Sequence, residues 1–345
     1  MHKKRVAIIG ATGYTGSELV GILKNHDKVE IALITSESRA GEKFSDVHRS
    51  FQGIVDDRLG KAEQIDQAEA DLVFLALPHG ISMEYVRRFA QKKFRIVDLS
   101  GDFRLSSPAM YTEWYQKDHT YKEGFEQAAY GLPELFRDEV KNARLVANPG
   151  CYPTSAILAL APLCKSNMLK TSTIIVDAKS GITGAGIKAK PVTHYSNVSD
   201  NFQAYGIKTH RHTIEIQNTL EELTGDMPPI QFTPHLLPVD RGILSTIYAQ
   251  PAEKTSREKL NALYKDFYQN EPFVRITENP PAIKEVRGSN YCNIYVDYDE
   301  RTNNIILISV IDNLVKGAAG QAVQNMNIML GFSEHEGLHQ IPMNP

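Results

Sequence analysis

Cysteine is scarce in this chain, and its few cysteines show no ligand or disulfide spacing. The 345 residues contain only Cys151, Cys164 and Cys292, and no CxxC pair. An odd number of cysteines without paired spacing favours neither a disulfide framework nor a zinc site. Cys164 lies in an apolar run and Cys292 in a strand-like stretch, so we expect both to pack in the interior. Cys151 differs, because it stands among turn residues.

Long apolar runs and an excess of positive charge are also missing. No apolar run approaches the roughly 20 residues that a membrane-spanning helix needs. The N-terminal residues 1–5 lead into a strand rather than a signal peptide. A formal net charge of −3 provides no basic footprint for nucleic acid or an anionic membrane. We therefore expect a cytoplasmic protein whose partners include neither nucleic acid nor a membrane.

The first half of the chain alternates apolar strands with helices. Strands are expected over residues 5–9, 29–35, 71–77 and 94–98, with one helix after Gly16 and another over 82–93. Near-continuous apolar strands separated by helices are typical of a parallel sheet covered on both faces. This half therefore predicts an α/β, Rossmann-type domain.

The second half has a different pattern. Strands are expected over residues 173–179, 230–237, 242–249, 291–297 and 304–311, and they are more often separated by turns or other strands than by helices. Such a pattern favours an α+β domain. A last helix is expected over 317–330. The length of the chain also favours two domains, and no repeat, low-complexity run or obvious linker separates them.

A glycine turn follows the first strand and opens a helix. Gly10, Gly13 and Gly16 are each three residues apart, which departs from the commoner G-x-G-x-x-G spacing. Glycines also serve ordinary turns, but in a strand–turn–helix context they let the backbone approach a pyrophosphate at the helix N-terminus. We therefore predict a dinucleotide site here, which also includes Thr12, Tyr14 and Thr15.

The end of the second strand discriminates between the two nicotinamide cofactors. An acidic residue there suits the ribose hydroxyls of NAD, whereas hydroxyls and an arginine suit the 2′-phosphate of NADP. The segment contains Glu37, but it also contains Ser36, Ser38 and Arg39. The set that binds phosphate is the more complete, so we predict NADP(H). Glu37 is either a solvated loop charge or the residue that makes this prediction wrong.

Residues 148–154, with the sequence NPGCYPT, place Cys151 at a turn before a helix that we expect from Thr154 onward. Unpaired N–H groups and the positive end of the dipole at a helix start stabilise a thiolate and an oxyanion. A buried structural cysteine is the alternative for an isolated Cys. The flanking turn residues favour a nucleophile.

Two further clusters supply a proton acceptor and an anion binder. His210 and His212 precede the apolar helical positions Ile216 and Leu220, and histidine titrates near neutrality. Incidental surface histidines are the alternative; no ligand spacing accompanies the pair, so we predict no metal.

The second cluster follows the fourth strand, at the end of a parallel strand where ligands bind. There Ser100 and Arg104 are placed to bind a phosphate or carboxylate. The alternative is an Arg104 paired with Asp102 or Asp98.

Taken together, the motifs closely resemble the N-acetyl-γ-glutamyl-phosphate reductases, the arginine-pathway relatives of the aspartate-semialdehyde dehydrogenases. The resemblance is carried by residues 10–16 (GATGYTG), 77–80 (LPHG), 98–104 (DLSGDFR), 130–134 (YGLPE), 148–154 (NPGCYPT), 180–186 (SGITGAG), 210–215 (HRHTIE) and 312–322 (DNLVKGAAGQA). Gly101, where alanine is expected, and Ile182-Thr183 depart from the family pattern without removing a functional group.

The resemblance implies that Cys151 attacks an acyl phosphate, that phosphate leaves, and that the thioester is reduced with NADPH to a semialdehyde. His212 is implied as the acid/base, because in the related dehydrogenases the histidine stands shortly before a carboxylate, here Glu215. His210 then orients the substrate, although the two roles could be exchanged. Implied substrate-binding residues are Arg104, Ser100, Asn148 and Glu215. Implied cofactor contacts, besides the glycine turn, are Leu77, Pro78, Ser180, Gly181, Gly184 and Asn313.

The resemblance also implies a division into an NADP-binding domain over 1–150 and 313–345, to which the last helix returns, and a catalytic and oligomerisation domain over 151–312. A homo-tetramer or homo-dimer is expected, with contacts through the sheet of the second domain. Two rival functions remain at this point: an aspartate-semialdehyde dehydrogenase-like enzyme acting on another acyl phosphate, and a dinucleotide-binding sensor without turnover. A substrate linked to a carrier protein is also open.

Overall fold

The computed structural model describes residues 2–170, 174–225 and 229–344. The chain forms two compact units, one of Met1–Pro149 with Ala318–His339 and one of Gly150–Gly317 with Gln340–Pro345. Unit 1 thus includes part of residues 313–345, which were predicted to return to the first domain.

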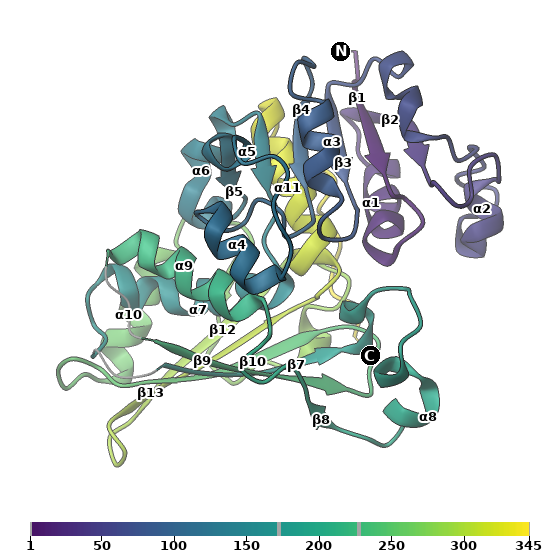
Figure 1. Cartoon of the computed structure of the whole chain (residues 1–345). Helices are drawn as coiled ribbons and strands as arrows, with labels where there is room; N and C mark the ends of the chain where they lie inside the picture. The colour runs from purple at the N-terminus through teal and green to yellow at the C-terminus, as the bar shows by residue number, and fades with distance from the viewer. Residues whose placement is uncertain (1, 171–173, 226–228, 345) are drawn as a thin grey trace. The chain divides into compact units, whose positions relative to one another are not determined.

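Unit 1 is built on a six-stranded sheet in which every paired strand is parallel, in the order β2-β1-β3-β4-β6-β5. Figure 1 labels β1 to β5 of this sheet. Its strands are β1 Lys4–Ile9, β2 Val29–Thr35, β3 Leu72–Leu75, β4 Arg95–Asp98, β5 Ala128–Tyr130 and β6 Leu145–Ala147. Its helices are α1 Tyr14–Lys24, α2 Phe44–Val47, α3 Ser82–Arg88, α4 Pro108–Tyr115, α5 Gly124–Gln127, α6 Pro133–Asn142 and α11 Gly320–Leu330, with short 3₁₀ turns η1 Arg49–Phe51 and η2 Ala62–Gln67. The α/β fold class predicted from the alternating pattern is confirmed.

Strand order positions the glycine turn. The sequence runs outward from β1 to β2 and then returns to β3 on the other side of β1. Ligands of open α/β sheets bind beyond the carboxyl ends of the strands at such a switch point. The turn after β1 and the segment after β3, which contains Leu77 and Pro78, therefore end at the same edge.

Unit 2 contains a seven-stranded mixed sheet in the order β11-β12-β13-β10-β7-β9-β8. Its strands are β7 Ile174–Gly181, β8 Gln203–Ala204, β9 Ile230–Leu237, β10 Ile243–Ala249, β11 Val274–Ile276, β12 Cys292–Asp299 and β13 Asn304–Ile311. Its helices are α7 Cys151–Lys165, α8 Tyr195–Val198, α9 His212–Thr224 and α10 Arg257–Phe267; the short turns are η3 Ile182–Ala185, η4 Pro191–Thr193 and η5 Ile283–Glu285, and the π-helical turn η6 Val315–Ala319 leads out of the unit. The predicted strand start at Thr173 lies outside the described residues.

Helix α7 forms the core of unit 2. Every residue from Tyr152 to Cys164 is buried, and the helix packs against α9 and the inner face of β10 and β13. Pro162 lacks the N–H that would bond to the Leu158 carbonyl one turn earlier. The Tyr268 hydroxyl donates to that carbonyl at 2.5 Å, so the buried acceptor is satisfied from outside the helix.

Candidate active site

The nucleophile candidate is the first residue of a helix. Gly150 is the N-cap of α7 and Cys151 follows it directly, whereas the sequence predicted a helix from Thr154 onward. The helix starts earlier because the Thr154 N–H bonds to the Gly150 carbonyl at 2.9 Å, which closes the first turn around the thiol. N–H groups of this first turn have no partner within the helix. Cys151 is therefore closer to them than the sequence implied.

The three thiols differ in environment. Cys151 is partly exposed, whereas Cys164 and Cys292 are buried, as expected from their apolar surroundings. Burial raises the pKa of the Cys164 thiol to about 12, so this thiol is protonated and inert at neutral pH. Backbone crowds Cys151 from one side, because a Cβ on Gly317 would lie 2.8 Å from the Cys151 Cβ. Glycine at 317 leaves that space to the Cys151 side chain.

Both predicted histidines lie at the start of α9. His212 is its first residue and His210 lies two residues earlier. The two rings are 4.7 Å apart between centroids, and the ring of Tyr152, the neighbour of Cys151, is 5.7 Å from His210 and 5.9 Å from His212. The fold of unit 2 therefore brings both histidines to the residue beside the thiol.

His210 is held in one protonation state. Burial lowers the pKa of its imidazole to about 4, helped by the charge of Arg211, so the ring is neutral at pH 7. The backbone N–H of His212 donates to Nδ1 of His210 at 3.1 Å. Because Nδ1 is an acceptor, the proton of the neutral ring is on Nε2. Nε2 of His210 can therefore donate a hydrogen bond but not accept a proton from a thiol.

Two tyrosines lie near the thiol: Tyr152 belongs to the motif of residues 148–154, whereas Tyr205 has no signal in the sequence. The Tyr205 hydroxyl donates to the Tyr152 hydroxyl at 3.3 Å, and Tyr152 donates to the His235 carbonyl at 3.1 Å. Burial raises the pKa of Tyr205 to about 12, with a further rise from nearby Cys151. Tyr205 also packs edge-on against His210, 5.5 Å between centroids. Tyr152 and Tyr205 therefore restrict the positions that the neighbouring histidine rings can take.

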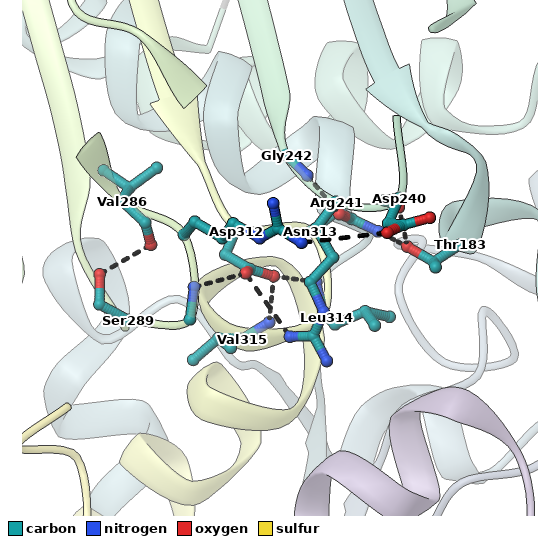
Figure 2. Close-up of polar contacts among 12 residues, drawn as sticks. Thr183, Asp240, Arg241, Gly242, Val286, Ser289, Asp312, Asn313, Leu314 and Val315 are labelled. Carbon is teal, nitrogen blue, oxygen red and sulfur yellow. Dashed lines mark hydrogen bonds and ion pairs between the residues drawn. The ribbon is translucent and has the colours of Figure 1, made fainter. Parts of the chain in front are cut away.

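The polar turn that carries Asn313 is tightly bonded (Figure 2). Oδ1 of Asn313 accepts the Gly242 N–H at 2.8 Å, and Nδ2 donates to the Thr183 hydroxyl at 3.0 Å. Asp312 accepts the N–H groups of Leu314 and Gly288. Asn313 is 2% exposed. The side chain thus connects η3, which includes Gly184, to the start of β10, and its predicted contact with the nicotinamide stays a prediction.

Neighbouring glycines of that segment serve the fold. Gly181 has no room for a side chain, because a Cβ would lie 2.6 Å from the Asp240 carbonyl oxygen. Ser180 is buried and donates to the Gly181 carbonyl at 2.9 Å. Gly184 lies next to both Ser180 and Asn313. The four predicted cofactor contacts of unit 2 are therefore neighbours in space.

In unit 1 the glycine turn has the local geometry of a phosphate cradle. Gly13 is the N-cap of α1 and an added Cβ would meet nothing within 4 Å. Gly16 is different, since a Cβ there would lie 2.4 Å from the Gly10 carbonyl oxygen. Gly16 therefore permits close helix–strand packing, and Gly13 leaves open space at a helix N-terminus, where the predicted contact with a pyrophosphate stays a prediction. Tyr14 and Thr15 begin the helix, and the Thr12 hydroxyl lies 3.2 Å from that of Ser36.

Gly10 and Gly13 give a matched pair of variants. Gly10 has a φ of +91°, and its Cβ would lie 2.5 Å from the Ala76 carbonyl oxygen. We expect Gly10→Ala to lower the free energy of unfolding by about 1–3 kcal/mol. Gly13→Ala at the N-cap is expected to cost at most about 1 kcal/mol, less than Gly10→Ala, and to weaken dinucleotide binding instead. Urea unfolding and isothermal titration separate the two effects; equal destabilisation by both variants would contradict this assignment.

Arg39 already pairs with a nearby carboxylate, which competes with a phosphate for its guanidinium. Its guanidinium bonds to both carboxylate oxygens of Glu42, with an Nη2–Oε2 distance of 2.7 Å, and both side chains are exposed. The pKa of the Glu42 carboxyl is lowered by its hydrogen bond to Arg39. Ser38 is exposed beside them, whereas Glu37 is directed to Tyr85, whose hydroxyl donates to it at 3.5 Å.

Glu42 occupies Nε and Nη2 of Arg39, so it competes with a 2′-phosphate for this edge of the guanidinium. We therefore expect Glu42→Gln to tighten NADP binding about two- to fivefold, in the range of an exposed ion pair, and to leave NAD binding unchanged. Titration of both cofactors measures this, with Glu278→Gln, which removes another exposed pair, as the control. Equal changes for NADP and NAD would show that Arg39 does not face the 2′ position.

The predicted anion binders of unit 1 form a buried polar framework. Nε of Arg104 donates to the Asn148 carbonyl at 2.7 Å and Nη2 to the Leu99 carbonyl at 2.8 Å. The Ser100 hydroxyl donates to Asp98 at 2.8 Å, and the Asn148 side chain bonds to Ala318 and Asn325. All three candidates are at most 7% exposed. They lie together, and their contact with substrate stays a prediction.

Asp98 and Asp102 are fully buried in the same framework. Burial raises the pKa of Asp98, and the charge of Asp102 raises it further. Asp102 accepts the N–H groups of Gly80 and Met83 and the Tyr111 hydroxyl. The carboxylate of Asp102 thereby fixes the segment after Pro78.

No group of three or more His, Cys, Asp or Glu side chains suited to a metal ion is found among the residues that the structure describes. In the same described ranges, no helix has the length and apolar character of a membrane span.

Comparison with known families places both units in one class. Residues 5–143 match the semialdehyde dehydrogenase NAD binding domain, and residues 151–313 match the semialdehyde dehydrogenase dimerisation domain. The fold agrees: aspartate semialdehyde dehydrogenase II of Vibrio cholerae superposes with a TM-score of 0.72 at 18% identity, covering 96% of this chain and 99% of the other. The NADP complex of the Candida albicans aspartate semialdehyde dehydrogenase gives 0.73 at 16% identity, covering 95% and 98%. The class is that of two-domain, NAD(P)-binding semialdehyde dehydrogenases.

Relatives of higher identity show to which family within this class the chain belongs. N-acetyl-γ-glutamyl-phosphate reductases of Desulforamulus reducens and Methanocaldococcus jannaschii are both 48% identical to this chain, over 340 and 344 residues. The alignments cover 97% of this chain and 97% of the first relative, and 99% and 100% for the second. The chain belongs to the N-acetyl-γ-glutamyl-phosphate reductase family. The resemblance first seen in the sequence motifs is thereby confirmed.

Proposed function

We propose that this enzyme reduces N-acetyl-γ-glutamyl phosphate to N-acetyl-L-glutamate 5-semialdehyde with NADPH, a step of arginine biosynthesis. The observation that carries the proposal is the partly exposed Cys151 in the first turn of α7, in the same unit as His210 and His212. A nucleophile beside a titratable base is the arrangement that covalent acyl transfer needs. The substrate is inferred from the family to which the chain belongs.

The chemistry proceeds in two stages on the sulfur. The Cys151 thiolate attacks the acyl carbon, a C–S bond forms, and the C–O bond to phosphate breaks to release inorganic phosphate and leave a thioester. When bound, NADPH supplies the hydride that reduces the thioester carbonyl. Collapse of the resulting thiohemiacetal releases the aldehyde and returns the thiolate, and N–H groups of the first turn of α7 are placed to stabilise the oxyanion.

We assign the acid/base role to His212. His210 is the weaker candidate, since its low pKa and its bonded Nδ1 leave only a donor at Nε2. As a donor, His210 can hold the substrate carbonyl or carboxylate. Arg104, Ser100 and Asn148 are proposed to bind the phosphate or carboxylate of the substrate.

NADP rather than NAD is the proposed cofactor. The open space at Gly13 suits the pyrophosphate, and Ser36, Ser38 and Arg39 provide hydroxyls and a guanidinium for the 2′-phosphate. Ser180, Gly181, Gly184 and Asn313 are proposed to line the nicotinamide side. The cytoplasmic location stays a prediction.

The reverse reaction gives the deciding assay. Phosphate-dependent reduction of NADP with N-acetylglutamate 5-semialdehyde is expected, with little or no rate for aspartate semialdehyde and a lower kcat/KM with NAD. A preference for aspartate semialdehyde would favour the aspartyl-phosphate alternative. Binding of NADP without any turnover would favour a sensor. Dependence of the forward rate on an amino-group carrier protein would reveal a carrier-linked substrate.

We further propose that unit 2 forms the subunit interface of a homo-dimer or homo-tetramer. The match to a dimerisation domain already indicates an oligomer. Helices pack on one face of the sheet, and the other face has an apolar row across three paired strands, Ile175, Tyr248 and Ile306. Ile175 and Tyr248 are each 40% exposed in the single chain. A second copy seated on this face would bury the row.

Tyr248→Asp tests this interface. A carboxylate buried against an apolar partner has no compensating contact, so we expect dissociation to a lower oligomer in light-scattering chromatography. Ile54→Asp is the control, since Ile54 is an exposed apolar residue of unit 1. An unchanged mass for Tyr248→Asp would place the interface elsewhere.

A further inference from the structure

Glu215 is a fully buried carboxylate that contacts the turn of the nucleophile. It lies on α9, three residues after His212, and is 0% exposed. Its Oε1 accepts the backbone N–H of Gly150 at 2.7 Å. Gly150 is the N-cap residue of α7, directly before Cys151. A charge-assisted hydrogen bond in a buried site therefore connects the two helices that carry the nucleophile and the histidines.

The bond replaces a cap that the sequence does not provide. Gly150 has no side chain, and α7 has no side-chain cap. The partial positive charge at the start of α7 also favours an anionic partner there. Gly317 also approaches the Cys151 Cβ. The Gly150-Cys151 turn thus contacts both a carboxylate of α9 and the backbone of the π-helical turn.

We propose that Glu215 is a positioning residue: it fixes the Gly150-Cys151 turn against the helix of the acid/base and makes no contact with substrate. This differs from the substrate-binding role that the family resemblance implied for Glu215, and it rests on the proposed function. Because His212 and Glu215 are one helical turn apart, α9 sets the base and the nucleophile with respect to each other. A displacement of about 1 Å between reacting groups can cost a hundredfold in rate.

The experiment compares kcat, KM and amide exchange in Glu215→Ala and Glu215→Gln. We expect Glu215→Ala to lower kcat about 100-fold with KM for the acyl substrate nearly unchanged, and to lose protection of the Gly150 amide in hydrogen exchange. Glu215→Gln retains an acceptor oxygen and is expected to recover most of kcat and the protection. Glu222→Gln on the same helix, whose parent carboxylate accepts from Asn218, is the control and should match wild type.

Two results would overturn the proposal: a raised KM with kcat preserved in Glu215→Ala, which marks a substrate contact, or a Gly150 amide equally protected in all variants. If Glu215→Ala does not fold, Glu215→Asp takes its place, because a carboxylate one methylene shorter no longer reaches the Gly150 N–H. A wild-type enzyme without turnover on any acyl phosphate would instead refute the proposed function, and the exchange measurement would still report whether Glu215 holds the turn.

Discussion

Cys151→Ser is expected to abolish turnover, with a loss on the order of 10⁴-fold or more, comparable to losses on removal of other acyl-transfer nucleophiles. A serine hydroxyl is not ionised at neutral pH, and the first turn of α7 favours an anion that the serine cannot supply. Steady-state assays in both directions, together with mass spectrometry for an acyl adduct on the peptide of residue 151, measure the effect.

The other two cysteines provide matched controls. Cys164→Ser and Cys292→Ser alter buried thiols, so they are expected to cost stability but to retain kcat per folded molecule. NADP affinity and far-ultraviolet circular dichroism of Cys151→Ser should match wild type. Normal turnover of Cys151→Ser would exclude a thioester on this residue.

The second large effect is expected at the histidines. His212→Asn should lower kcat by about 10²–10³-fold, within the range for loss of a general acid/base, and remove the acid limb of the pH–rate profile. Asparagine has no group that titrates near neutrality, whereas the neighbouring His210 has a pKa of about 4 and is already deprotonated across that range.

His210→Asn serves as the comparison. Its neutral ring donates through Nε2, so the variant should raise KM more than it lowers kcat and should keep the acid limb. Loss of that limb in His210→Asn, with a normal limb in His212→Asn, would exchange the two roles.

The sequence predicted the central elements of the fold because their signals are local. A strand, a glycine turn and a helix follow one another within residues 4–24, and β2, β9 and β13 have the predicted bounds. The strands β5 and β6 were not predicted, since each has three residues, which is too short for a period to be recognised. Helix α3 ends at Arg88, five residues before the predicted end.

Contacts at the candidate site were harder to predict, because they join residues far apart in the sequence. Cys151 and the two histidines stand in recognisable segments. The bond of Tyr205 to Tyr152 and that of Glu215 to Gly150 have no sequence pattern. Each requires two elements to be packed before the contact exists.

The return of the chain to unit 1 has a consequence for synthesis on the ribosome. Helix α11 packs against α1, α6 and β4, and its Asn325 donates to the Gly131 carbonyl at 2.9 Å. All of unit 2 up to Gly317 is translated before this helix emerges, an interval on the order of ten seconds or more at roughly 5–20 residues per second. During that time the surface of unit 1 that α11 covers lacks this helix, so unit 1 begins to fold first but is completed only after most of unit 2 has been translated.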